Sequence, residues 1–128
     1  MEPLTTANLL AFTKRFRCKG GLLLRFRIRN NSREACLATL VLSVQDNTTK
    51  KTVRLRLRFR GVEEYRFQRR PGQKMVRLTE VKFGFFEGLL YLNLDAFAEA
   101  DALIDFRASD WYLGAKSAEW ELLAKSPK

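Results

Sequence analysis

Arginine alternates with apolar residues in two stretches of the chain, a pattern that can bind anions. The charged positions are Arg25, Arg27 and Arg29 in the first stretch and Arg54, Arg56, Arg58 and Arg60 in the second. A guanidinium can grip a carboxylate or a phosphate through two parallel hydrogen bonds. Rows of arginine at this spacing therefore indicate a surface for polyanions.

The period of two places these arginines on strands, because neighbouring side chains of a β-strand point to opposite faces. Each stretch should bury its apolar side and expose its cationic side, as in an antiparallel sheet with one buried face. The arginine face could bind nucleic acid or an acidic protein, or it could be a solvated face partly matched by acidic residues. Phe26 and Phe59 fall on the buried side. Nucleic-acid binding through this face would thus depend on the phosphate backbone and be weakly specific.

A second basic group surrounds a turn. Arg66, Arg69 and Arg70 precede Pro71 and Gly72, which are typical turn residues. This basic loop could contact phosphate, although we expect a solvated turn.

The acidic residues of the last third could be considered as a metal or acid–base site. They are Asp95, Glu99, Asp101, Asp105 and Asp110, and their spacing matches no calcium-binding loop. We expect Arg107 to pair with Asp105 or Asp110. Without such a motif, these acids predict no catalytic residue.

The chain has two cysteines and no histidine. Without histidine, a Ser-His or Cys-His nucleophile is excluded, and two distant thiols do not make a zinc site. We expect Cys18 and Cys36 to be free thiols, and we predict no metal, no cofactor and no enzymatic activity.

Charge is distributed unevenly along the 128 residues, whose net charge is +10. Positions 1–82 carry 20 basic and 6 acidic residues, whereas positions 83–128 carry 4 and 8. This asymmetry suggests a polyanion surface, or an acidic segment that lies across the arginine face. No signal peptide or membrane span is evident, so the cytoplasm is the expected compartment.

The hydrophobic pattern predicts one domain with a short N-terminal helix or arm (1–20), a sheet core (22–123) and a frayed tail (124–128). The hydrophobic pattern of region 6–16 predicts a helix capped by Thr5 or Thr6, with a strand over 13–18 as the alternative. Strands 22–29, 36–45 and 51–60 should form a meander whose neutral middle strand separates the two arginine strands. Further strands are expected over 75–83, 88–95, 104–111 and 118–122, a bulge near 79–80, turns at 19–21, 69–73 and 84–88, and a short helix from Asp95 through Asp101.

Three strings resemble those of small, β-rich bacterial proteins of the planctomycete type that have no assigned activity. The strings are Arg58-Phe59-Arg60-Gly61-Val62-Glu63-Glu64-Tyr65-Arg66-Phe67-Gln68, the segment 83–95, and Asp105-Phe106-Arg107-Ala108-Ser109-Asp110. The element Phe59-x-Gly61-Val62 is also similar to one in small β-rich immunity proteins of bacterial toxin systems. Neither resemblance implies a functional residue.

We therefore expect a mainly β fold: a single antiparallel sandwich or half-open barrel of about seven strands with one or two short helices. The expected function is a non-enzymatic binding domain. Its cationic sheet face would bind an acidic protein partner or mediate self-association as a homodimer. The alternative is a nucleic-acid binder that reads the backbone.

Overall fold

The computed structural model describes residues 1–30, 36–68, 76–96 and 101–123. Its strands and helices are, in chain order, β1 (Glu2–Leu4), α1 (Leu9–Arg15), β2 (Phe16–Arg29), β3 (Cys36–Asp46), β4 (Lys51–Phe67), β5 (Val76–Arg77), β6 (Glu80–Phe86), β7 (Leu89–Ala96), α2 (Leu103–Arg107) and β8 (Trp111–Leu123).

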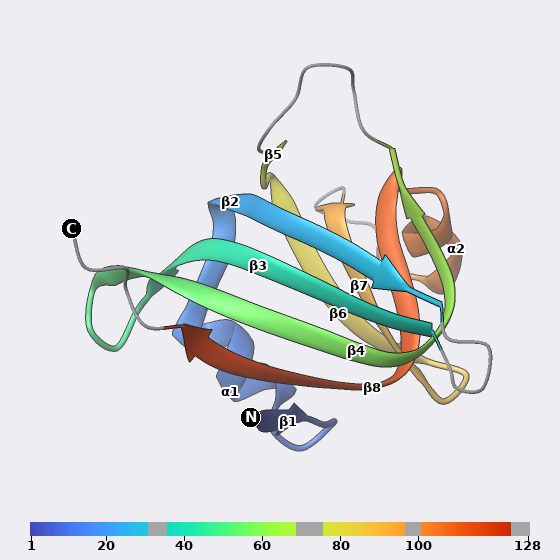
Figure 1. Cartoon of the computed structure of the whole chain (residues 1–128), viewed down its shortest axis with the longest axis horizontal. Helices are drawn as coiled ribbons and strands as arrows, with labels where there is room; N and C mark the ends of the chain where they lie inside the picture. The colour runs from blue at the N-terminus through green and yellow to red at the C-terminus, as the bar shows by residue number, and fades with distance from the viewer. Residues whose placement is uncertain (31–35, 69–75, 97–100, 124–128) are drawn as a thin grey trace.

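All strands of the described residues belong to one antiparallel sheet that curls into a half-barrel (Figure 1). Its order is β5-β2-β3-β4-β8-β7-β6, and β1 pairs with β8 off this path. The predicted mainly β fold is confirmed, as is the meander of β2, β3 and β4. Because β1 joins the sheet and β2 begins at Phe16, the sheet starts well before position 22.

The curl brings the two ends of the sheet together at one point. The N–H of Gly20 donates to the carbonyl of Leu78, and the N–H of Leu78 donates to the carbonyl of Gly21, both at 2.8 Å. Leu78 lies between β5, which pairs with β2, and β6, which pairs with β7. The break between β5 and β6 at Leu78 agrees with the bulge predicted near 79–80.

The apolar core fills the inside of the half-barrel. Alternate residues of the central strands are fully buried there, among them Leu40 and Leu42 of β3 and Leu57 of β4. Helix α1 closes the core at one end, where the ring of Phe12 packs against Trp120 with 5.5 Å between centroids. The buried side that the alternation predicts is thus the inner face of the sheet.

The helix near the N-terminus combines both predicted alternatives. It ends at Arg15, and the strand expected as its competitor begins at Phe16. The N-cap residue is Asn8, not a threonine. The backbone N–H of Thr5 donates to the Asn8 Oδ1 atom at 2.8 Å, so these two residues together shape the start of the helix.

One predicted turn is wrong, because Gly20 and Gly21 form an irregular stretch within a strand. Positions 19–21 lie within β2, where Gly20 has a φ of 83° and the pairing with β3 shifts register between Arg17 and Leu22. The connection predicted at 84–88 is shorter, because β6 continues to Phe86 and only Glu87 and Gly88 turn the chain. The turn predicted at 69–73 lies outside the described residues.

The ambiguous segment after position 60 continues β4 as a strand. Gly61 has a φ of 67°, and the pairing with β8 shifts register between Val62 and Glu64. This irregularity is typical of a β-bulge, which bends a strand and redirects its side chains. Glu64 is presented beyond this bulge.

The strand predicted over 104–111 is wrong, because helix α2 occupies its first part. Leu103 and Phe106, three positions apart, pack on the Tyr91 side of β7, opposite to the main core, whereas Ile104 is 75% exposed. The alternation of Ile104 and Phe106 suggested a strand, but the spacing of Leu103 and Phe106 fits one helical face. The helix expected from Asp95 was placed too early, and most of that segment lies outside the described residues.

Both cysteines are free thiols in the structure. Cys18 is buried, and this burial raises the pKa of its thiol to about 12. Among the described residues no helix is long and apolar enough to cross a bilayer.

Candidate functional site

The three central strands present the arginines on the outer face of the half-barrel. Strands β2, β3 and β4 lie side by side at the front of Figure 1, with β6 and β7 behind them. Strand β3 separates the two arginine strands, as its neutral sequence predicted. Three consecutive outward residues of β3 have an arginine on either side: Leu37 lies between Arg29 and Arg60, Thr39 between Arg27 and Arg58, and Val41 between Arg25 and Arg56.

These nine residues line a hollow of about 390 Å³, which we call the arginine groove. Its two walls are the arginines of β2 and of β4, and its floor is β3. The walls lie two strand spacings apart, about 10 Å between backbones, and arginines within a wall repeat about every 7 Å. The groove is therefore an open channel with an arginine on each side at every second residue of its floor.

Two arginines of the β4 wall pair with acidic residues from the last third of the chain. Glu121 of β8 accepts a hydrogen bond from Arg56 at 2.8 Å, and Glu119 accepts one from Arg60 at 3.1 Å. Within the described ranges, Arg25, Arg27, Arg29 and Arg58 form no ion pair. As far as the described residues go, the β2 wall has no acidic partner, and acidic residues cover the arginine face at the β4 edge.

Arg54 extends the β4 wall beyond the arginine groove. It is exposed and flanks Ser43 of β3, and it does not line the hollow. Six of the seven predicted arginines therefore share one groove, and the seventh stands at its end.

Arg66, the described residue of the predicted basic loop, does not line the arginine groove. Arg66 donates hydrogen bonds to the carbonyls of Arg107 (3.2 Å) and Ser109 (3.4 Å), and its guanidinium lies 5.9 Å from the Tyr112 ring centroid. Arg69 and Arg70 lie outside the described residues. Arg66 holds the segment between α2 and β8 in place.

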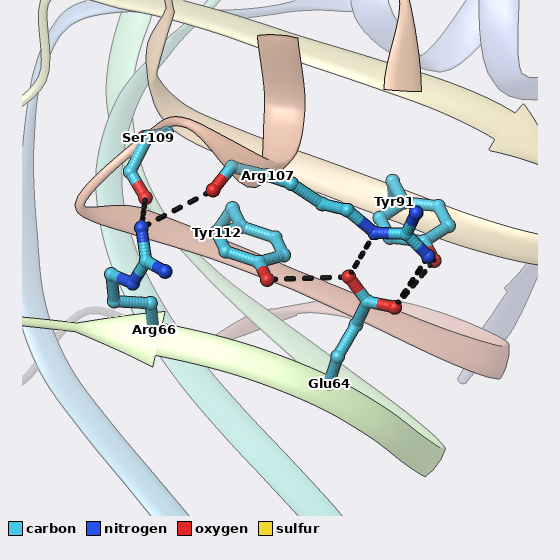
Figure 2. Close-up of polar contacts among 6 residues, drawn as sticks. All are labelled: Glu64, Arg66, Tyr91, Arg107, Ser109 and Tyr112. Carbon is cyan, nitrogen blue, oxygen red and sulfur yellow. Dashed lines mark hydrogen bonds and ion pairs between the residues drawn. The ribbon is translucent and has the colours of Figure 1, made fainter. Parts of the chain in front are cut away.

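A polar cluster around Glu64 lies where α2 covers the sheet (Figure 2). The Glu64 carboxylate accepts two hydrogen bonds from Arg107, at 2.8 and 3.0 Å, and one each from the hydroxyls of Tyr91 (2.9 Å) and Tyr112 (3.2 Å). We call these four residues the Glu64 cluster. The hydrogen bonds from Arg107 hold the pKa of Glu64 below its usual range. Burial, followed by the nearby carboxylate, raises the pKa of Tyr91 and Tyr112.

Sequence reasoning missed the Glu64 cluster, and the pairing predicted for Arg107 with Asp105 or Asp110 is wrong. Arg107 binds Glu64, which is 43 positions away in sequence. Asp105 instead accepts a hydrogen bond from the backbone N–H of Ala102 at the start of α2. No local signal could have identified this partner. The ionised carboxylate is fully engaged and the tyrosines stay protonated, so the cluster is built to hold α2 on the sheet.

Three of the five acidic residues considered for catalysis, Asp95, Asp101 and Asp105, serve separate local roles. Asp95 accepts a hydrogen bond from the Thr79 hydroxyl at 3.0 Å, and Asp101 pairs with Lys82. Glu99 lies outside the described residues. Across the described ranges, no group of three or more cysteine, aspartate or glutamate side chains could hold a metal ion.

Comparison of the chain with protein-family models, with curated proteins and with solved structures found no match.

Proposed function

We propose that this protein is a binding domain whose arginine groove takes an extended, acidic segment of a protein partner. The observation that carries the proposal is the arrangement of charge. Three pairs of arginines face each other across a neutral floor, and four of the six form no ion pair within the described residues. Exposed like charges about 7 Å apart repel by roughly 0.6 kcal/mol in water. An anionic ligand relieves this repulsion.

The dimensions of the groove favour a single extended chain. An extended peptide repeats every second residue at about 7 Å, as the arginines do. Lying along β3, such a chain directs successive side chains alternately to the two walls. A run of consecutive acidic residues thus reaches both walls, whereas an α-helix, about 10–12 Å wide, could only lie on top of them.

The floor of the groove suits the backbone and aliphatic stems of such a peptide. Leu37, Thr39 and Val41 are half-buried and carry no charge. Carboxylates would meet the arginines in bidentate fashion. The groove would thereby neutralise its own charge and cover the apolar part of its floor.

Self-association through this face is disfavoured on electrostatic grounds. Two copies meeting groove to groove would oppose arginine with arginine, and like charges placed opposite one another destabilise an interface. Glu119 and Glu121, which lie next to the groove arginines, already pair within the chain. A homodimer formed this way is therefore the weaker form of the proposal.

The second candidate is a nucleic acid, which the guanidiniums of both walls favour because arginine binds phosphate equally well. Single-stranded nucleic acids, however, are usually held by aromatic side chains that stack on the bases. The residues lining the groove include no aromatic ring. We therefore favour the acidic peptide and make the oligonucleotide an arm of the test.

The test measures fluorescence anisotropy with a labelled penta-glutamate peptide, a penta-glutamine peptide and a single-stranded hexanucleotide of similar charge. We expect only penta-glutamate to bind well, and the double variant R27A/R58A to lose about tenfold or more in affinity. The matched control K14A/K51A removes the same charge from exposed positions outside the groove. Tighter binding of the oligonucleotide would replace the proposal with the second candidate. Binding of neither ligand at low salt, or equal losses in both double variants, would overturn it.

A further inference from the structure

A second cationic hollow adjoins the arginine groove along β3. Its volume is about 380 Å³, and its lining includes Arg17, Lys19 and Arg77 together with Ser43 and Gln45 of β3. We call it the second hollow. The glycine-containing irregularity of β2 at Gly20 and Gly21 lies in its wall.

The floors of the two hollows belong to one row of side chains. Leu37, Thr39 and Val41 line the arginine groove, and Ser43 and Gln45, at the next alternate positions of β3, line the second hollow. The row covers eight steps of the strand, about 26 Å. A chain that follows β3 would therefore pass from one hollow into the other.

The charges of the second hollow are arranged differently. Lys19 pairs with Glu80 at 3.3 Å, and Arg77 donates to the carbonyl of Gly20 at 3.4 Å. Arg17, which lies opposite Gln45, is exposed and forms no ion pair among the described residues. On the other side of the strand, Gln45 faces the neutral Thr52. Among the described residues, neither Arg17 nor Arg77 has an acidic partner, and Arg17, on the β2 side, is the one of the two whose side chain also forms no hydrogen bond.

We propose that the two hollows form one elongated site for an acidic segment of about nine residues. This inference rests on the proposed function and specifies its ligand. One end of the segment carries consecutive acidic residues for the three arginine pairs, and the other end carries an acidic residue for Arg17. Between them lies a step where Ser43 has an arginine, Arg54, on one side only and Leu22 on the other. A neutral residue is tolerated there.

The experiment compares three labelled peptides at about 0.15 M salt. The first is penta-glutamate. The second adds two serines and two glutamates, and the third adds four serines. The extended peptides are made with the extension at either end, because strand direction along β3 is free. We expect one of the two glutamate-ended peptides to bind about three- to tenfold more tightly than the serine-ended one.

The variant R17A locates the effect. Arg17 is about 13 Å along the strand from the nearest pair of facing arginines in the arginine groove. This distance exceeds the screening length of about 8 Å at this salt concentration. R17A should remove the advantage of the glutamate-ended peptide and leave penta-glutamate binding unchanged, whereas K14A, which removes one exposed charge elsewhere, should alter neither. If the extended peptides bind alike, or if R17A weakens both ligands equally, the elongated site is wrong. Binding of penta-glutamate would still support the proposed function, and its absence would reject both.

Discussion

The outer face of the sheet uses arginine in two opposite ways. Where α2 covers the sheet, Arg107 is fixed by two hydrogen bonds to Glu64, and the carboxylate also accepts from two tyrosines (Figure 2). In the arginine groove, Arg27 and Arg58 face each other across Thr39 without a carboxylate partner in the described residues. The first arrangement satisfies its charges internally. The second leaves them for a ligand.

Because the two groups use arginine differently, their effects on stability and on binding can be tested separately. A hydrogen-bonded ion pair at a partly buried position stabilises the fold, and removing one partner leaves polar groups unsatisfied. Exposed arginines that repel one another contribute little or negatively to folding. Substitutions in the Glu64 cluster should therefore change stability, and substitutions in the arginine groove should change binding.

The largest effect on stability is expected for E64A. Arg107 and the hydroxyls of Tyr91 and Tyr112 lose their common acceptor, so the free energy of unfolding should fall by about 2–3 kcal/mol. Urea denaturation followed by circular dichroism measures this change. The neighbouring E63A is the matched control, because Glu63 is exposed and its ion pair with Lys116 is 3.8 Å long. Equal changes in the two variants would mean that the cluster does not hold α2.

A second expected effect is a loss of affinity after R27A/R58A with little change in stability. Removing two facing charges lessens repulsion, so the free energy of unfolding should stay within about 0.5 kcal/mol of the original value or rise slightly. Urea denaturation of the variant, alongside the peptide titration, checks both. A fall in the free energy of unfolding by more than about 1 kcal/mol would show that the groove arginines stabilise the fold. The contrast between the groove and the Glu64 cluster would then be wrong.

Freeing the β4 wall should strengthen binding. In E119Q/E121Q, Arg56 and Arg60 lose their acidic partners and become available to a ligand, so penta-glutamate affinity should rise about three- to tenfold. The stability cost should stay below about 1 kcal/mol because both pairs are partly exposed. Anisotropy titration measures the gain. Unchanged affinity would indicate that the β4 wall does not contact the peptide.

The smallest effect is a difference in pH dependence. The depressed pKa of Glu64 means that its ionised form is favoured by folding, so its contribution is complete at neutral pH. That contribution is lost as pH falls below the usual glutamate range and through the lowered pKa of the folded state. The original protein should therefore lose more stability than E64Q between pH 7 and acid conditions. If the free energy of unfolding, measured by urea denaturation at each pH, falls in parallel for the original protein and E64Q, this role of Glu64 is contradicted.

Much of the candidate site could be predicted from local pattern. The period-two alternation of Arg25, Arg27 and Arg29 with Leu24 and Phe26 specifies the outward face of β2 wherever that strand is placed. The neutral sequence of β3 also favours its position between the arginine strands. What the pattern could not predict was the pairing of Arg56 with Glu121, because their 65-residue separation depends on the register of β4 and β8.

The sequence by itself determined which side chains share a strand face, since that is a property of the extended backbone. Which of the arginine charges have an acidic partner depends on the tertiary structure. The bulge after Gly61 presents Glu64 toward Arg107, and α2 forms where Phe106 can pack against Tyr91, with 6.3 Å between ring centroids. Both depend on contacts between distant segments. The position of each charged side chain on a strand face is therefore a local property, whereas its availability to a partner depends on the fold.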